Sequence, residues 1–170
     1  MSDNGRLDDL RRRIEKDPAS IAFAQLAEEC RRLGRDQEAI DICRQGLERH
    51  PGYLSARVTL GRALLHAGQL DEAKHELDTV LQGAPQNLAA LRALGDVHRR
   101  RSDLPQAMTL YQTALSLAPN DPELERALAE LSEILVQAEN ERENVRTRRH
   151  LAALEQWLTA IHVTRAQRSA

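Results

Sequence analysis

The sequence predicts an all-α solenoid made of repeated helix pairs, and three observations support this fold class. Pro51, Pro85 and Pro119 recur at a spacing of 34 residues. Ala, Leu, Glu, Arg and Gln, which are common in helices, dominate the composition. Aromatic residues make up only 2% of the 170 residues, and this disfavours β-sandwiches and barrels, whose cores depend on aromatic and β-branched side chains.

The 34-residue period is present in several independent registers. An alanine of the second helix, a leucine of the first helix and a leucine near the end of the second helix each recur with this period. A shared period of this length is the signature of a stacked helical array. The residues in these registers are Ala39, Ala73 and Ala107, then Leu26, Leu60 and Leu94, then Leu47, Leu81 and Leu115.

Each repeat is predicted to form two amphipathic helices joined by a turn. In the middle repeat, Leu60 and Leu64 have helical spacing, and Gly68 suits the left-handed conformation that ends a helix. Leu77 lies on the second helix, which ends before Pro85. The corresponding turns are expected at Gly34 in the first repeat and at 102–105 in the third, where Asp103 and Pro105 suit a helix start.

The ends of the array are predicted to be atypical, because a terminal unit has no neighbour on one side. Leu7, Leu10 and Ile14 indicate a leading half repeat, and Leu124 and Leu128 indicate a closing helix. The predicted divisions are a capping helix at 1–19, three repeats at 20–53, 54–87 and 88–121, a capping helix at 122–138, a charged linker at 139–149 and a separate amphipathic helix at 150–168.

These positions resemble the tetratricopeptide repeat (TPR) family, in the form of its small bacterial members. The resemblance implies a right-handed α-solenoid that binds other proteins in a groove lined by the first helices. Cys, Leu and His replace the family's aromatic residues in the bulky slots. The matching residues are Phe23, Leu26, Ala27, Cys30, Ala39, Cys43 and Pro51, then Arg57, Leu60, Gly61, Leu64, Ala73, Leu77 and Pro85, then Leu91, Leu94, Gly95, His98, Ala107, Tyr111 and Pro119.

The sequence contains no motif for catalysis or metal binding. Its six histidines do not form HExxH spacing, its two cysteines stand 13 residues apart, and it has no phosphate-binding loop. We therefore predict no enzymatic activity, no metal and no cofactor. A net charge of −2 disfavours nucleic-acid binding. The first residues lack the apolar segment of a signal peptide, so a cytoplasmic location is expected.

The first helices are predicted to line a peptide-binding groove whose second and third repeats are basic. Arginine binds carboxylates well, so an acidic peptide or C-terminus is an expected ligand; the alternative is that these residues form ordinary solvated helix faces. Some family members bind chaperone C-termini through Lys and Asn, but Ala24 and Glu28 occupy such places here, so that activity is not expected. The candidates are Glu28, Arg31, Arg32, Val58, Arg62, Leu65, His66, Arg92, Asp96, Arg99 and Arg100.

The C-terminal segment lies outside the 34-residue register. Its apolar stripe consists of Leu151, Leu154, Trp157, Leu158 and Ile161, and the preceding linker fits either a charged helix or a flexible spacer. The stripe is predicted to fold onto its own array as a lid, to dock on another protein or copy, or to lie on a membrane surface, the last being disfavoured by its narrow width. Together these features predict a non-catalytic protein-binding scaffold, or alternatively a self-assembling subunit or membrane-surface adaptor.

Overall fold

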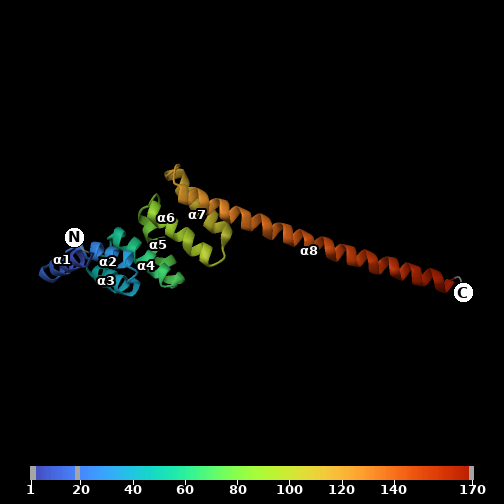
Figure 1. Ribbon diagram of the computed structural model, residues 1–170, viewed down its shortest axis with the longest axis horizontal. Coiled ribbons are helices and arrows are strands. Elements are labelled where there is room, and N and C mark those ends of the chain that lie inside the picture. Colours follow the sequence, from blue (N-terminus) through green and yellow to red (C-terminus); the bar gives the residue numbers. More distant parts are fainter. Residues whose placement is uncertain (1–2, 18–19, 169–170) are drawn as a thin grey trace. The chain divides into compact units, whose positions relative to one another are not determined.

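The computed structural model describes residues 3–17 and 20–168, with side chains described for 5–17 and 20–159. The described residues form helices and no strand, which confirms the predicted all-α class (Figure 1). In chain order the helices are α1 (Asp3–Lys16), α2 (Ala22–Arg32), α3 (Asp36–Arg49), α4 (Leu54–His66), α5 (Leu70–Gly83), α6 (Leu88–Arg100), α7 (Leu104–Leu117) and α8 (Pro122–Arg168).

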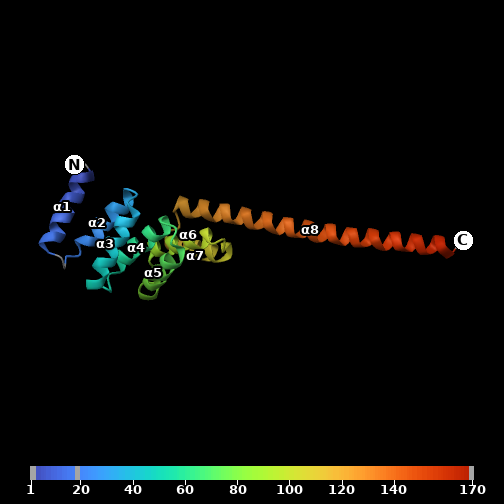
Figure 2. The same ribbon diagram turned by 90° about the horizontal axis from the view of Figure 1, so that it is seen from below.

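The chain divides into two compact units, Met1–Leu128 and Ala129–Ala170. In the first unit, the two helices of each repeat pack together as α2 with α3, α4 with α5, and α6 with α7. Each first helix also packs against the first helix of the next repeat, so α2 contacts α4 and α4 contacts α6 (Figure 2). This nearest-neighbour stacking is the solenoid that the 34-residue period predicts.

The turns inside the three repeats share one backbone conformation. Gly34 and Gly68 have φ angles of 72° and 79°, and Ser102 has a φ of 61°. This left-handed conformation suits glycine, whereas a residue with a Cβ adopts it at a cost. The glycine signal in the sequence therefore marked a real conformational requirement, and the third repeat meets it with a serine.

Replacing Ser102 with glycine should raise the free energy of unfolding by about 1 kcal/mol, and Gly68→Ala should lower it by a similar amount. A Cβ at Gly68 would find no atom within 4 Å, so the expected loss is conformational and not steric. Urea denaturation measures both changes. Gly52→Ala is the control, because that glycine also has open space but no positive φ. A Ser102→Gly variant less stable than the parent would contradict this account.

The helix pairs approach closely where the sequence places small residues. A Cβ built at Gly61 would lie 2.7 Å from Cγ of Leu77, and one built at Gly95 would lie 2.4 Å from Cε1 of Tyr111. Ala39, Ala73 and Ala107 are fully buried. Close backbone approach in each pair therefore depends on the absence or smallness of these side chains.

His98 occupies a core position in the third repeat. Its ring is buried, and its Nδ1 lies 2.9 Å from Oδ2 of Asp103. Asp103 also caps α7, because its Oδ1 accepts a hydrogen bond from the backbone N–H of Gln106 at 3.4 Å. The predicted cap at this turn is thus present. The same carboxylate also forms a hydrogen bond with the buried His98 ring, which occupies the core position that Leu64 fills in the preceding repeat.

Helix α8 runs without interruption from Pro122 to Arg168. The sequence predicts a capping helix at 122–138, a linker at 139–149 that fits either a charged helix or a flexible spacer, and a separate helix from 150, whereas the structure has one continuous helix. The physical reason is that no glycine or proline follows Pro122 in the helix, and Glu and Arg in the linker favour helix. Among the described residues, no helix combines the length and apolar character needed to cross a bilayer.

Candidate functional site

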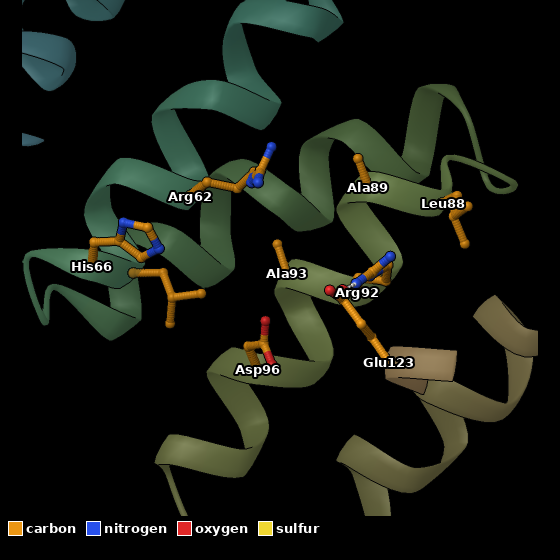
Figure 3. A pocket seen from close by; sticks show the side chains of 9 residues that line it. Arg62, His66, Leu88, Ala89, Arg92, Ala93, Asp96 and Glu123 are labelled. Carbon is orange, nitrogen blue, oxygen red and sulfur yellow. Dashed lines mark hydrogen bonds and ion pairs between the residues drawn. The ribbon is translucent and has the colours of Figure 1, made fainter. Parts of the chain in front are cut away.

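The exposed side of α2, α4 and α6 carries the candidate site, which we call the inner face. A cavity of about 520 Å³ opens on it over α4 and α6 (Figure 3). Its lining comes from two adjacent repeats and from the first turn of α8. The lining residues are Arg62, Leu65, His66, Leu88, Ala89, Arg92, Ala93, Asp96 and Glu123.

Five of the residues predicted for the groove line this cavity, namely Arg62, Leu65, His66, Arg92 and Asp96. The remaining lining residues, which were not among those candidates, are Leu88, Ala89, Ala93 and Glu123. Glu123 stands 34 residues after Ala89, so continuing the repeat register into the capping helix would have found it. Arg92 and Glu123 meet at the edge of the cavity, as Figure 3 shows.

Arg92 is held by acids at the start of α8. Its Nη1 donates to Oδ2 of Asp121 at 2.7 Å, and its Nη2 pairs with Glu123. Asp121 also accepts backbone hydrogen bonds from Glu123 and Leu124, at 3.0 and 3.3 Å, and so caps that helix. The charge of Arg92 is therefore largely compensated, and its role includes fixing the junction between the third repeat and α8.

Glu28 is the centre of a second charge cluster, on α2 and α4. Arg31 donates to it twice, at 3.1 and 2.6 Å, and the hydroxyl of Thr59 donates at 3.2 Å. Burial by itself would raise the pKa of Glu28, but the hydrogen bonds and charge of Arg31, with the charge of Arg62, outweigh it and lower that pKa. Glu28 is thus ionised and stabilises the buried guanidinium of Arg31, whose side chain is only 9% exposed.

Asp96 is oriented by the core of the third repeat. The hydroxyl of Tyr111 donates to its Oδ1 at 2.6 Å, and Nη2 of Arg99 lies 3.7 Å from the same oxygen. Burial and this hydrogen bond raise the pKa of Tyr111. A carboxylate fixed in this way at the cavity wall supplies an acceptor for a donor on a ligand.

Of the two arginines that line the cavity, Arg62 has the longer ion pair. Its Nη1 lies 3.7 Å from Oε1 of Glu28, longer than the bonds of Arg31 and Arg92, and its side chain is 39% exposed. Burial, together with the positive charges of Arg31 and Arg92, lowers the pKa of Arg62. A carboxylate brought to Arg62 would compensate the positive charge that burial and the neighbouring arginines disfavour.

His66 contributes a second polar group at the α4 end of the cavity. Its Nδ1 lies 3.4 Å from Oδ1 of Asp36, at the start of α3. That oxygen is buried and has no hydrogen-bond partner among the described residues. His66 and Asp36 therefore form a contact between neighbouring repeats, beside the cavity.

The remaining predicted residues lie outside the cavity. Arg100 donates to the backbone oxygen of Leu65 at 2.6 Å and links two repeats, Val58 is buried, and Arg32 is exposed with Glu29 at 3.7 Å. The cavity lining holds two arginines and two acids. The basic character expected of the groove is therefore concentrated at Arg62.

The apolar stripe of the C-terminal segment is exposed on α8. Leu151, Leu154, Trp157 and Leu158 have exposed fractions between 50% and 62%. The side chain of Ile161, which the sequence places in the stripe, lies outside the described residues. The lid arrangement stays a prediction.

No group of three or more metal-binding side chains gathers among the described residues. Cys30 and Cys43 are buried free thiols. Burial raises the pKa of Cys30 to about 11 and that of Cys43 to about 12, so both are protonated at neutral pH and are poor nucleophiles.

Comparison with protein families and known proteins supports the repeat assignment. Models of the tetratricopeptide repeat match residues 32–97 and 88–131. A stretch of 92 residues is 31% identical to the phagocyte signaling-impaired protein of Drosophila pseudoobscura pseudoobscura, covering 54% of this chain and 10% of that protein. Another of 79 residues is 41% identical to the FK506-binding protein-like protein of Rattus norvegicus, covering 46% and 21%. The chain thus spans a tenth to about a fifth of these relatives.

Solved structures share the fold at low sequence identity. MamA 41-end from Desulfovibrio magneticus RS-1 superposes with a TM-score of 0.73 at 21% identity, covering 84% of this chain and 81% of that one. The first TPR domain of human RPAP3 gives 0.66 at 20% identity, covering 71% and 94%. The first TPR of Spaghetti (RPAP3) bound to the HSP90 peptide SRMEEVD gives 0.65 at 19% identity, covering 68% and 92%.

Two features thus agree: the repeat-model matches together span residues 32–131, more than half of the chain, and the helix pairs stack with the spacing and small-residue contacts described above. The chain belongs to the tetratricopeptide repeat family.

Proposed function

We propose that this chain is a non-catalytic adaptor that binds a peptide or helix of another protein on its inner face. The observation that carries the proposal is the cavity over α4 and α6, where the incompletely paired Arg62 stands beside the apolar Leu88, Ala89 and Ala93. A ligand segment with a carboxylate next to a small apolar side chain fits this combination. Helix α8 provides a second docking surface.

Family membership supports a protein ligand, and a related structure is described as bound to an HSP90 peptide. We do not extend that chaperone peptide to this chain, because Ala24 and Glu28 stand where the Lys and Asn of the carboxylate clamp would be needed. A negative charge at Glu28 disfavours a terminal carboxylate in the first repeat. The proposed acidic group of the ligand therefore binds one repeat further on, at Arg62.

We place the adaptor in the cytoplasm, where a reducing environment keeps cysteines as thiols. The free state of Cys30 and Cys43 fits this location.

Arg62→Ala should weaken peptide binding about 10- to 100-fold, because a hydrogen bond to a charged group contributes roughly 1.5–3 kcal/mol. The measurement is fluorescence anisotropy with heptapeptides selected against the whole chain from a random library. Selected sequences should contain Asp or Glu beside Ala, Val or Leu, and replacing the acid by its amide should produce a comparable loss.

Arg32→Ala is the matched control for charge, because Arg32 is exposed on α2 but lies outside the cavity. Its affinity for the selected peptides should stay within about twofold of the parent. Equal losses for the two variants would show that binding depends on overall charge and would remove the support for a site at Arg62. If the selected peptides lack an acidic residue and bind Arg62→Ala as tightly as the parent, the support for a site at Arg62 would also be removed.

A further inference from the structure

The charges that line the cavity on the inner face cancel. The lining holds two arginines, Arg62 and Arg92, and two acids, Asp96 and Glu123. Arg92 and Glu123 pair with each other, whereas Arg62 and Asp96 each lie 3.7 Å from the partner in their ion pairs. A ligand with acidic groups alone would be attracted by Arg62 and repelled by Asp96. The cavity therefore favours a ligand that carries both signs of charge.

Asp96 is positioned to accept a hydrogen bond from a ligand. Its Oδ1 accepts the hydroxyl of Tyr111 at 2.6 Å, and because that ring is buried, the carboxylate has a fixed place on the cavity wall. Nη2 of Arg99 lies beyond hydrogen-bond distance of the same oxygen. A carboxylate has acceptor sites on both oxygens, and the side chain of Asp96 is 42% exposed. It can therefore bind an ammonium or guanidinium group.

Arg62 supplies the opposite charge one repeat earlier. It stands 34 residues before Asp96, so the two residues occupy equivalent positions on α4 and α6. Burial lowers the pKa of Arg62, and the charge of Asp96 opposes that shift, as expected of two groups that line one cavity. In Figure 3 the side chain of Ala93 is seen between them. The two charges thus stand on neighbouring helices with a small apolar residue in the wall.

The spacing of the two charges follows from helix packing. Helices α4 and α6 are in contact, and packed helices have axes about 8–10 Å apart. A polyproline II segment rises about 3.1 Å per residue with three residues per turn, so its residues three apart lie on one side at about 9 Å. A β-strand places residues three apart on opposite sides. Side chains three residues apart in a polyproline II segment therefore match Arg62 and Asp96.

We propose that the ligand of the inner face is a dipolar peptide segment in polyproline II conformation, in which an Asp or Glu binds Arg62 and a Lys or Arg, three residues away, binds Asp96. Either order of the two residues fits, because the contacts are made by side chains. This inference rests on the proposed function, since it names the class of peptide that the same cavity binds.

A series of peptides tests the ligand class on the unaltered protein. Heptapeptides selected against the whole chain, as above, should contain an acid and a base three positions apart. Replacing the base by Gln, or moving it two positions along the peptide, should weaken binding about tenfold, because a hydrogen bond to a charged group is lost. Fluorescence anisotropy measures each affinity. Equal affinities at every spacing would show that only total charge matters and would overturn the proposal.

Asp96→Asn tests the same contact from the side of the protein. Asparagine keeps an oxygen that can accept from Tyr111, so the fold should be retained, and urea denaturation checks this. Binding of the selected peptide should weaken about tenfold, whereas binding of the peptide with Gln in place of its base should change by less than about twofold. Variant and altered peptide together should therefore lose about tenfold and not about a hundredfold, as expected for two groups in contact.

Asp41→Asn is the matched control for charge. Asp41 is exposed on α3 and lies outside the cavity, and the substitution removes the same negative charge. The affinities for the selected peptide and for its Gln form should both stay within about twofold of the parent. An equal loss in Asp41→Asn would show that the overall charge of the chain attracts the basic residue, and this would overturn the contact at Asp96.

Comparison of Asp96→Asn with Arg62→Ala separates this inference from the proposed function. If Arg62→Ala weakens binding but Asp96→Asn strengthens it or leaves it unchanged, the ligand is a purely acidic peptide. The proposed function then stands, and the dipolar ligand is overturned. If Arg62→Ala leaves binding unchanged, the proposed site fails, whatever the result at Asp96. Losses in both variants, with the base required three residues from the acid, establish the dipolar ligand.

Discussion

Gly95→Ala should lower the free energy of unfolding by about 2–3 kcal/mol, although alanine favours helix over glycine by roughly 1 kcal/mol. The reason is steric, because the added methyl group would lie 2.4 Å from Cε1 of Tyr111 and 2.7 Å from its Cδ1. The ring is buried and its hydroxyl is tied to Asp96, so it has little freedom to move aside. Urea denaturation followed by circular dichroism measures the loss.

The first repeat of the same chain suggests how the clash is relieved. The positions of Gly95 and Tyr111 correspond, two periods earlier, to Ala27 and Cys43, so a larger residue on one helix accompanies a smaller one on the other. Tyr111→Cys alone should cost about 3–5 kcal/mol through the cavity that it leaves. The loss of unfolding free energy in the double variant Gly95→Ala/Tyr111→Cys should be smaller than the sum of the two single losses by about 1–2 kcal/mol.

Gly83→Ala provides the control for helix propensity. A Cβ at this position would lie 3.4 Å from Cδ1 of Leu54, at the edge of ordinary contact, so its effect on unfolding should stay within about 0.5 kcal/mol. Additive behaviour in the Gly95 and Tyr111 cycle would mean that these two residues do not share the tight contact. The complementary sizes seen across the repeats would then have another origin.

Glu28→Gln should lower the free energy of unfolding by about 2–3 kcal/mol at pH 7, because it removes the carboxylate that hydrogen-bonds the buried guanidinium of Arg31 and leaves only the weaker charge interaction with Asp36. The pKa of Glu28 is lowered in the folded chain, so its ionised form stabilises the fold above the ordinary pKa of a glutamate. That contribution is lost as the pH falls through the lowered value. The difference between parent and variant should therefore be constant from pH 7 to about 5 and shrink below about pH 4.

The same substitution should change binding in the opposite direction. Removing the carboxylate leaves Arg62 without its nearby acid at 3.7 Å, so an acidic peptide should bind Glu28→Gln about three- to tenfold more tightly. Glu48→Gln is the control, because Glu48 is exposed on α3 away from the inner face. Thermal unfolding across pH and peptide anisotropy at pH 7 test the two halves. Unchanged stability would show that Arg31 does not depend on Glu28.

Local signals in the sequence were sufficient for the repeat architecture. Glycine at the turn, proline after the second helix and leucine at helical spacing each act within a few residues, so they could be interpreted without knowledge of the fold. The left-handed φ at Gly34 and Gly68 and the cap at Asp103 agree with these signals. Even the continuity of α8 was present in the sequence as the absence of any helix breaker after Pro122, although the charged linker obscured it.

Tight contacts in the core depended on combinations across helices. The approach of Gly95 to Tyr111 joins positions 16 apart, and a Cβ at Gly46 would lie 2.1 Å from Cδ2 of Phe23, a position 23 residues earlier. No local pattern marks Gly46, which stands where the other repeats have Val80 and Ala114. The aromatic ring of Phe23 fills the space that a side chain at this position would take.

The sequence by itself determined the fold class, the helix pairs and the turns, because these follow from spacing along one helix. Only the tertiary structure decided which arginines are compensated. Arg92 donates a hydrogen bond to Asp121, 29 residues later in the sequence, and Arg100 donates one to the Leu65 carbonyl, 35 residues earlier. Glu28, which pairs with Arg31, also accepts a hydrogen bond from Thr59, 31 residues later. Electrostatic compensation depends on distances between neighbouring repeats, which composition and period do not contain, and it leaves Arg62 as the incompletely paired cation of the cavity.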